Sequence, residues 1–292
     1  MEFRVLQYFL AVAEEKNISR AAEKLHVTQP NVSRQLRDLE TELGTTLFER
    51  GSHQIELTSD GLYLANQARQ ILALVNKTED NLQNLAEISG SLTIGSGESP
   101  TMMTIVENIK ALQENYPNVK VNLVSTNADV VQKNLQTGIF DFGVVMEPTD
   151  KRKFDFLTLP GVDEWGLLLR KDHQLAQRKF IEPRDFHQLD LIISQQSGVE
   201  NFLKNWLGTS IAQYKIVASY NLLYNASLLV EARLGAALAF NGIINNTELK
   251  FVPLNPPQTA HCSLIWQRGT TLSPAGKIFL KMVKQFCAET SK

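Results

Sequence analysis

The chain has 292 residues, of which 43% are hydrophobic, and its formal net charge of −2 does not favour any class of partner. This length and hydrophobic content allow a substantial core, divided between a small domain and one of about 200 residues. Two cysteines, Cys262 and Cys287, are too few for a disulfide framework, and residues 1–17 do not have the pattern of a signal or membrane-spanning segment, so we expect a cytoplasmic protein.

A first helix is predicted around Phe3 to Glu14. Within it, apolar residues recur at the spacing of one helical face, which suits packing against the helices that follow. These residues are Phe3, Leu6, Phe9, Leu10 and Ala13.

Residues 17–40 predict two short helices joined by a tight turn. Ser19 is expected to cap the first of them, Arg20 to Leu25, and Thr28 the second. Pro30 falls in the first turn of the second helix, where its missing N–H costs nothing. The second helix repeats apolar residues on one face, which we expect to be buried. These residues are Val32, Leu36, Leu39 and Leu43.

The opposite face of this second helix is polar. Arg can bond guanine bidentately, and Gln or Asn can do so with adenine, so this face suits reading base edges in a DNA groove. An ordinary helical hairpin with a solvated face is the alternative interpretation of these residues alone. The candidate DNA-binding residues here are Thr28, Gln29, Pro30, Asn31, Ser33, Arg34 and Arg37.

A longer pattern surrounds these helices and closely resembles the N-terminal domain of LysR-type transcriptional regulators. The resemblance implies a winged helix-turn-helix over residues 1–58, with Gln54 to Leu57 in the wing, and it adds Arg50, His53 and Gln54 to the DNA-binding set. The pattern consists of Arg20-Ala21-Ala22, Leu25, Val27-Thr28-Gln29-Pro30, Val32-Ser33-Arg34-Gln35-Leu36, Leu39-Glu40, Leu43-Gly44, Leu47-Phe48, Arg50, Leu57-Thr58 and Gly61.

The wing departs from the family pattern. The family usually places basic residues there, whereas the tip of this wing is Gly51-Ser52-His53-Gln54-Ile55-Glu56. Residues 1–58 hold seven Lys or Arg against nine Asp or Glu, a net charge of about −2. Because non-specific affinity comes mostly from neutralised phosphates, we expect weak non-specific binding and reliance on several copies binding together.

A long helix is predicted from a cap at Thr58 to about Ile88, with Asp60 in its first turn. Its apolar residues form a heptad seam that suits a partner helix; packing on the chain's own first domain is the alternative. The resemblance implies a dimerisation linker at residues 59–89, which would present two reading helices to a roughly palindromic site. The seam consists of Leu64, Ala68, Ile71, Val75, Thr78, Leu82 and Leu85.

Residues 90–292 alternate predicted strands and helices, which indicates an α/β fold with parallel strands. The predicted strands are Leu92–Gly95, Val119–Val124, Asp141–Val145, Trp165–Leu169, Leu191–Ser194, Lys215–Ala218, Ala236–Phe240, Leu249–Val252 and Cys262–Trp266. The predicted helices are Met102–Asn115, Asp129–Gln136, Val199–Leu207, Leu222–Leu234 and one starting at Ser273-Pro274.

This half resembles the effector domain of the same family, which is built like a two-lobed periplasmic solute-binding protein. The resemblance implies one lobe of residues 90–159 with 268–292 and another of 160–267. It also implies crossings near Glu147 to Leu159 and near Trp266 to Thr271, a hinged cleft, and pairing of dimers into tetramers. Arg233 and Phe240 stand where the family commonly has glycine and proline; we expect Arg233 to be a surface charge rather than an anion partner.

Ligands of open parallel sheets bind beyond the C-terminal strand ends, near helix N-termini that favour anions. The loops there suit a small polar or anionic metabolite, although their hydroxyl and amide groups also suit ordinary helix caps. The resemblance favours four residues, and five more are weaker candidates. The first set is Ser99, Thr101, Thr126 and Ser194; the second is Pro100, Met102, Asn127, Met146 and Asn221.

Other functions receive less support from the sequence. Gly95-Ser96-Gly97 is a fragment of a dinucleotide fingerprint, but Pro100 replaces the third glycine. The five histidines show no metal-ligand spacing, and no nucleophile elbow occurs. We therefore predict that the protein is not an enzyme and that it has no cofactor and no metal site. A stand-alone solute-binding module and an architectural DNA-binding protein without an effector remain the alternatives to an effector-controlled transcriptional regulator.

Overall fold

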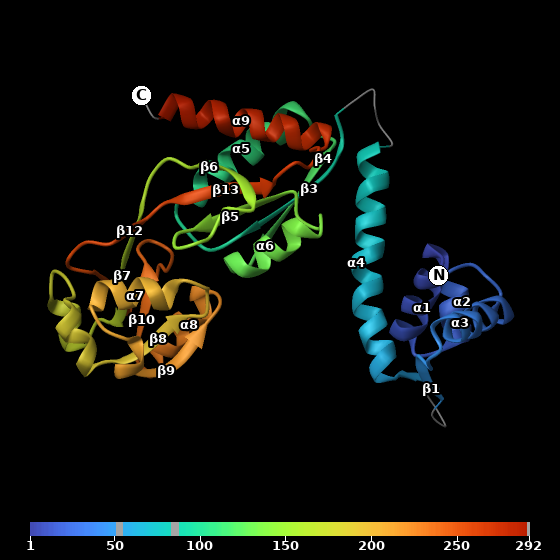
Figure 1. The fold of residues 1–292 in the computed structure, drawn as a ribbon, viewed down its shortest axis with the longest axis horizontal. Helices are drawn as coiled ribbons and strands as arrows, with labels where there is room; N and C mark the ends of the chain where they lie inside the picture. Colours follow the sequence, from blue (N-terminus) through green and yellow to red (C-terminus); the bar gives the residue numbers. More distant parts are fainter. Residues whose placement is uncertain (51–54, 83–87, 291–292) are drawn as a thin grey trace. The chain divides into compact units, whose positions relative to one another are not determined.

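The computed structural model describes residues 1–50, 55–82 and 88–290, and it divides the chain into two compact units, Met1–Leu82 and Gln83–Lys292. The first unit has four helices among its described residues, with an antiparallel hairpin before the last of them (Figure 1). Its elements are α1 (Phe3–Glu15), α2 (Ile18–Lys24), α3 (Gln29–Leu43), β1 (Phe48–Arg50), β2 (Ile55–Leu57) and α4 (Ser59–Leu82).

The capping residues of α2 and α3 agree only in part with those predicted from the sequence. Asn17, and not Ser19, caps α2: its side chain accepts a hydrogen bond from the Arg20 backbone N–H at 3.1 Å, because the helix begins one residue before Ser19. Thr28 is the N-cap residue of α3, although its side chain makes no capping hydrogen bond. Gly44 ends α3 at a φ of 67°, a left-handed conformation that glycine adopts without strain.

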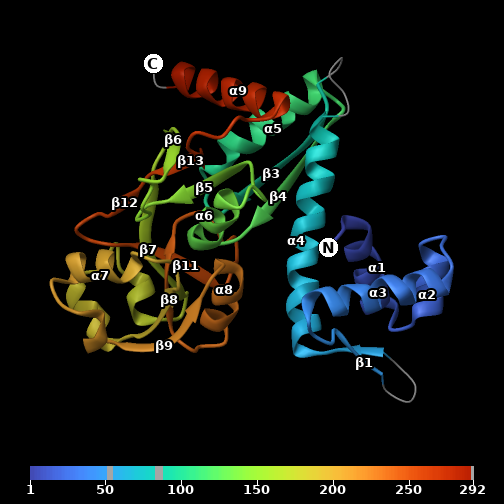
Figure 2. The ribbon, with the colours of Figure 1, turned by 45° about the vertical axis from the view of Figure 1, so that its right-hand side comes forward.

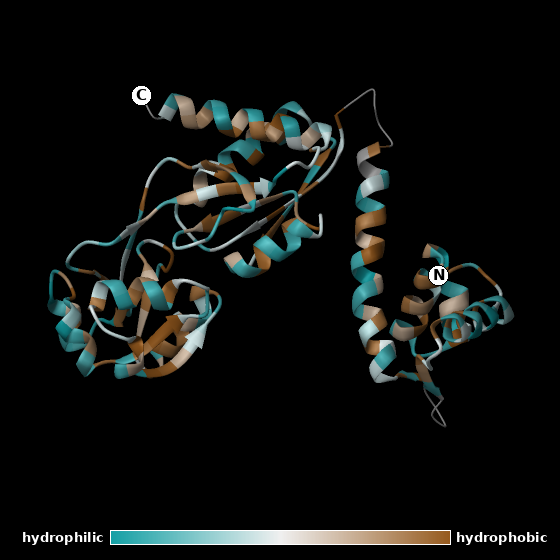
Figure 3. Cartoon of the chain, in the orientation of Figure 1, coloured by the Kyte–Doolittle hydropathy of each residue, from teal (hydrophilic) through white to brown (hydrophobic). Residues whose placement is uncertain are grey.

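The core of the first unit forms where α1, α2 and α3 meet. Val32, Leu36 and Leu39 are buried as predicted. Leu43 and Phe3 are exposed, at 42% and 56%, which corrects the expectation that they join the buried faces. Each is the terminal residue of its helix and lies beyond the core. Apart from its buried apolar residues, α3 is mostly hydrophilic (Figure 3).

The apolar stripe of α4 packs partly within the first unit. Leu64 and Ala68 are buried against this core. The heptad seam predicted that they would pack on a partner helix, whereas here they pack within their own unit. The physical reason is that α1 packs against α4 and shares this core with it. Ile71 and Val75 are half-buried and Leu82 is 66% exposed, while Leu85 lies outside the described residues.

The described residues of the second unit form two sheets, which stay separate in both views (Figures 1 and 2). In the first sheet the strand order is β4-β3-β5-β13-β6, with β3, β4 and β5 parallel and β13 antiparallel to its neighbours. Its elements are β3 (Gly90–Ser96), α5 (Met102–Asn115), β4 (Val119–Ser125), α6 (Ala128–Gln136), β5 (Phe142–Met146), β6 (Phe154–Thr158), β13 (Cys262–Gln267) and α9 (Pro274–Thr290).

Helices cover both faces of the first sheet. Alternate residues of β5 point to opposite faces. Phe142 and Val144 belong to the core that contains apolar residues of α5 and α9, whereas Val145 packs with Val131 and Leu135 of α6. This pattern explains why the strand is buried along its whole length.

The second sheet has the order β11-β7-β10-β8-β9, with β12 paired to β7. Strands β10, β8 and β9 are parallel. Short 3₁₀ helices span Gln174–Gln177, Pro183–Gln188 and Ile211–Gln213. The other elements are β7 (Asp163–Arg170), β8 (Asp190–Ser194), α7 (Val199–Leu207), β9 (Lys215–Tyr220), α8 (Leu223–Glu231), β10 (Ala236–Phe240), β11 (Leu249–Pro253) and β12 (Thr259–Ala260).

The chain crosses between the two sheets twice, and the second crossing differs from the expectation. The expected lobe of residues 160–267 includes strand β13, but in the structure β13 pairs with β5 and β6 of the first sheet. The return crossing is therefore at His261, between β12 and β13, and not near Trp266 to Thr271. The first crossing falls between Thr158 and Asp163, after β6, a strand that the sequence did not predict. Among the described helices, none is long and apolar enough to cross a membrane.

Candidate functional site

The outward face of α3 is the candidate nucleic-acid surface of the first unit. The side chains of Arg34 and Arg37 are exposed on it, opposite the buried apolar residues. Nε of Arg37 donates to the carbonyl of Ser33 at 3.3 Å, which orients the guanidinium along the helix. At the N-terminal end Thr28, Gln29 and Pro30 are exposed, and Asn31 and Ser33 are half-buried.

Glu40 fixes the position of the hairpin relative to this helix. Its Oε1 accepts hydrogen bonds from the backbone N–H groups of Leu47 (2.7 Å), just before strand β1, and of Phe48 (3.3 Å), the first residue of β1. Arg50 ends β1, and nothing is described of its side chain. The predicted wing residues His53 and Gln54 lie outside the described residues.

A cavity of about 40 Å³ lies between the two lobes of the second unit. Its walls come from the C-terminal ends of six parallel strands, the edge at which open α/β sheets bind ligands. Residues at or just after these ends are Gly97, Thr126, Met146, Ser194, Tyr220 and Phe240.

Five of the nine candidate effector-binding residues line this cavity. They lie at or just after the C-terminal ends of β4, β5, β8 and β9, so the structure brings together residues far apart in sequence. Their role in binding stays a prediction. These residues are Thr126, Asn127, Met146, Ser194 and Asn221.

The other four candidates do not line the cavity. Oγ of Ser99 donates to Oδ2 of Asp163 at 2.5 Å, and Oγ1 of Thr101 donates to Oδ1 at 3.1 Å. Asp163 is only 4% exposed, and a buried carboxylate needs such donors. Sδ of Met102 lies 2.8 Å from Oγ of Ser96, and Pro100 lies against Gly242 of the second lobe, where an added Cβ would meet it at 3.1 Å.

Sequence reasoning missed several lining residues. Glu98 and Gln196 stand in loops that the strand pattern had selected, one or two residues from the side chains that were named. Trp165 and Phe240 come from β7 and β10, whose apolar residues predicted only a core. A search of each selected loop for ionisable side chains would have found Glu98.

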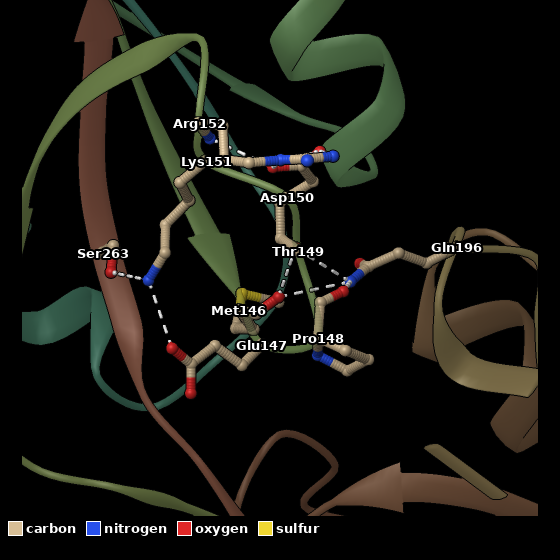
Figure 4. A network of polar contacts seen from close by, with 9 residues as sticks. All are labelled: Met146, Glu147, Pro148, Thr149, Asp150, Lys151, Arg152, Gln196 and Ser263. Atoms are coloured by element: carbon tan, nitrogen blue, oxygen red, sulfur yellow. Dashed lines mark hydrogen bonds and ion pairs between the residues drawn. The ribbon is translucent and has the colours of Figure 1, made fainter. Parts of the chain in front are cut away.

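Hydrogen bonds join the two lobes beside the cavity. Nε2 of Gln196 lies 3.2 Å from the carbonyl oxygen of Met146 and 3.4 Å from that of Pro148, so one amide from the β8–α7 loop reaches the end of β5 (Figure 4). On the first lobe, Nζ of Lys151 donates to Glu147 at 3.1 Å and to Ser263 at 3.0 Å (Figure 4). These contacts hold the loop after β5 in place.

A larger cavity, of about 510 Å³, lies at the opposite end of the second sheet. There Arg170 and Arg233 both contact Asp172, at 3.0 and 2.6 Å, and their hydrogen bonds lower the pKa of this carboxyl to about 2. Arg233 is 66% exposed and paired, as expected for a surface charge. We take the inter-lobe cavity as the candidate site because it lies at the C-terminal strand ends.

Comparisons with protein families agree with this two-part architecture. The family described as "LysR substrate binding domain" matches residues 86–288. The family described as "Bacterial regulatory helix-turn-helix protein, lysR family" matches residues 3–62.

Individual proteins are similar along much or all of the chain. The "Hca operon transcriptional activator HcaR" of Escherichia coli (strain K12) is 28% identical over 300 residues, 100% of each chain. The "HTH-type transcriptional regulator AlsR" of Bacillus subtilis (strain 168) is 32% identical over 193 residues, 66% of this chain and 64% of that one. The structure of full-length CbnR complexed with its target DNA has a TM-score of 0.74 at 22% identity, covering 98% of this chain and 99% of that one. The structure of full-length BenM has a TM-score of 0.55 at 23% identity, and the match covers 100% of this chain and 98% of that one.

Proposed function

Because the chain belongs to the LysR family of DNA-binding transcriptional regulators, we propose that α3 reads promoter DNA and that a small molecule between the lobes controls the outcome. The single observation that carries the proposal is the joint presence, in one chain, of an exposed polar face on α3 and a cavity walled by six strand ends. Both regions fall within the matched family domains, which are those of regulators and not of enzymes.

In this proposal Arg34 and Gln29 contact base edges, since both are exposed on α3 and carry donors suited to bidentate bonds. Arg37, which is exposed on the same face, contacts a phosphate. Arg50 and His53 are DNA-binding candidates on the resemblance alone. Glu40 contributes indirectly, because its bonds to the start of β1 set the angle between α3 and the hairpin.

We further propose a division into residues 1–58, 59–89 and 90–292, in which α4 pairs two subunits. Since Leu64 and Ala68 are already buried within one unit, the pairing face would use the later part of the helix. Leu74 and Leu82 are exposed there, at 41% and 66%, beside half-buried Ile71 and Val75. A dimer would offer two reading helices to a roughly palindromic site, and dimers would pair into tetramers.

Control by the effector follows from linkage. A metabolite that prefers one closure state of the lobes shifts the placement of the reading helices by no more than its differential affinity for the states. We propose a small polar effector, because hydroxyl and amide groups line much of the cavity. We also propose a cytoplasmic location, because the proposed target is promoter DNA.

The experiment that tests this function recovers DNA fragments bound by the purified chain from its source genome and sequences them. Enrichment of a few sites with dyad symmetry is the expected result. Arg34→Ala should then weaken binding to those sites by about 1–3 kcal/mol. Arg152→Ala, which removes an equal charge from an exposed side chain of the second unit, should leave binding unchanged.

Failure to enrich any fragment, with or without a metabolite extract, would contradict the proposal and favour the stand-alone solute-binding module. Enrichment that no metabolite changes, with no ligand-dependent thermal shift, would favour an architectural DNA-binding protein.

A further inference from the structure

Two carboxylates of the first lobe bond the N-terminal ends of helices in the second lobe. Oε2 of Glu98 accepts a hydrogen bond from the backbone N–H of Leu223, the first residue of α8, at 2.5 Å. Oδ2 of Asp129 accepts from the backbone N–H and the hydroxyl of Ser197, at 3.1 and 3.0 Å. Ser197 directly precedes Gly198, the N-cap residue of α7.

The Glu98 contact fills a position where an anionic ligand would be expected. The first N–H groups of a helix lack partners within the helix, and the helix dipole adds partial positive charge, so such ends attract anions. No capping side chain of α8 itself serves this role, since Leu222 is its N-cap residue. At α8 the protein therefore supplies its own anion, and a carboxylate ligand at this helix end would have to displace Glu98.

The charge on the cavity wall also opposes an anion. Glu98 is the one acidic residue among the described residues that line it, and no Lys, Arg or His of the described chain is among them. The remaining polar groups are neutral hydroxyls and amides. A second carboxylate placed here would face a negative charge with no cation to offset it.

The apolar wall of the cavity is aromatic. Trp165, Tyr220 and Phe240 line it, and the ring centroids of Trp165 and Phe240 are 3.9 Å apart. The hydroxyl of Tyr220 donates to the carbonyl of Leu238 at 2.6 Å. Burial, together with the nearby charge of Glu98, raises the pKa of this phenol above its ordinary value, so the ring stays neutral. Neutral aromatic faces attract cations.

We propose that the inter-lobe cavity binds a small primary ammonium group, with the Glu98 carboxylate as its counter-ion and the aromatic side chains as its walls. The inference rests on the proposed function, because it names the chemical class of the effector for that same site. At its volume of about 40 Å³, the cavity between the lobes has room only for a small group such as the ammonium. The ammonium takes lone pairs of Glu98 that the single bond to Leu223 leaves available.

The test compares three probes of similar size and different charge: propylammonium, propionate and propanol, at matched ionic strength. Binding to the full chain is measured by ligand-observed NMR and thermal shift, with affinities expected in the millimolar range for so few atoms. Propylammonium should bind at least about tenfold more tightly than propionate, equivalent to about 1.4 kcal/mol. Propanol should fall between them.

Glu98→Gln tests the role of the charge, since the amide oxygen can still accept the bond from Leu223 and the fold should be kept. The variant should bind propylammonium at least about tenfold more weakly, with its preference over propanol lost. The matched control is Glu107→Gln, which removes the same charge from an exposed position on α5 and should change nothing.

Tighter binding of propionate than of propylammonium, no binding of propylammonium, or an unchanged affinity in Glu98→Gln would each overturn the inference. DNA binding by the same preparations separates the two proposals. A chain that binds its promoter but not the amine contradicts only the ligand class. One that binds the amine at Glu98 but no DNA contradicts only the proposed function.

Discussion

The Cys262 thiol lies 3.0 Å from Oδ2 of Asp163, and this contact joins the two strands at which the chain crosses between its lobes. Asp163 opens β7 after the first crossing, and Cys262 opens β13 after the second. The same carboxylate accepts hydrogen bonds from Ser99 and Thr101 at the start of α5. One buried acid therefore ties both crossings to the first lobe.

Asp163→Asn should destabilise the second unit by about 1–3 kcal/mol, because the amide offers one acceptor where three donors converge. Chemical denaturation followed by tryptophan fluorescence would measure the change, since Trp165 lies two residues away. Asp150→Asn is the control: that carboxylate is exposed and pairs only locally with Arg152, so stability should not change measurably. Equal stabilities of wild type and Asp163→Asn would show that the buried acid does not hold the crossings.

The Cys262 thiol should make stability depend on alkaline pH. Burial raises its pKa above the ordinary thiol value, and the charge of Asp163 adds to this shift. In the unfolded chain the thiol ionises from about pH 8.5 upward, while the folded protein keeps it protonated. The stabilising contribution is thus fully present below that pH and is lost as pH rises, by up to about 1.4 kcal/mol per pH unit.

Cys262→Ser retains a hydroxyl donor but cannot ionise in this range. Its free energy of unfolding, measured under reducing conditions between about pH 7.5 and pH 10, should fall less steeply than that of the wild type. Cys287, whose pKa is also raised by burial, contributes to both proteins, so the difference isolates Cys262. Identical slopes would contradict the prediction.

Periodicity predicted the elements well where local signals agree. The predicted helices Met102–Asn115 and Val199–Leu207 have the same ends as α5 and α7 in the structure. Strand β13 was predicted as a strand but placed in the wrong lobe. Its apolar residues do not specify which sheet it joins, because its pairing with β5 depends on residues more than a hundred positions away.

The candidate site, too, combines features that local sequence predicts with features that depend on distant residues. Strand ends selected the loops after β3, β4 and β8, and residues of all three loops line the inter-lobe cavity, since parallel strands present these ends at one edge. Within the first loop, however, Ser99 and Thr101 turn to Asp163, and Glu98 lines the cavity instead. Which side chain of a loop faces a cleft depends on such distant partners, and spacing within the loop carries no information about them.

The backbone conformation at Arg233 should be strained, and a glycine at this position would relieve that strain. Its φ of 66° is left-handed, a conformation that costs a side-chain-bearing residue roughly 1–2 kcal/mol. Arg233→Ala keeps this strain and loses the ion pair with Asp172, whereas Arg233→Gly loses the ion pair and the strain together. Glycine should therefore be more stable than alanine by about 1 kcal/mol in denaturant titrations. If alanine were equal or better, the backbone conformation here would not be strained.

Gly61 should be essential to the first unit. A Cβ added to this glycine near the start of α4 would lie 2.1 Å from the carbonyl oxygen of Leu47, a backbone atom that cannot rotate away. Leu47 is held in turn, because its N–H donates to Glu40 at 2.7 Å and its carbonyl accepts from the N–H of Thr58 at 3.1 Å. Gly61→Ala should accordingly destabilise the unit by about 1–3 kcal/mol, through overpacking that outweighs the better helix propensity of alanine.

Gly276→Ala provides the matched control, since Gly276 also lies near the start of a helix, α9. An added Cβ there would meet the Ser273 hydroxyl at 3.3 Å and Leu272 and Phe142 side chains beyond 3.4 Å, contacts that small side-chain shifts relieve. Its stability should stay within about 1 kcal/mol of the wild type. Circular dichroism during thermal unfolding would compare both variants, and DNA binding by Gly61→Ala should weaken together with its stability. A Gly61→Ala protein as stable as the control would mean that α4 can move away from Leu47 at little cost, and that the hairpin is not held at a fixed angle to α3.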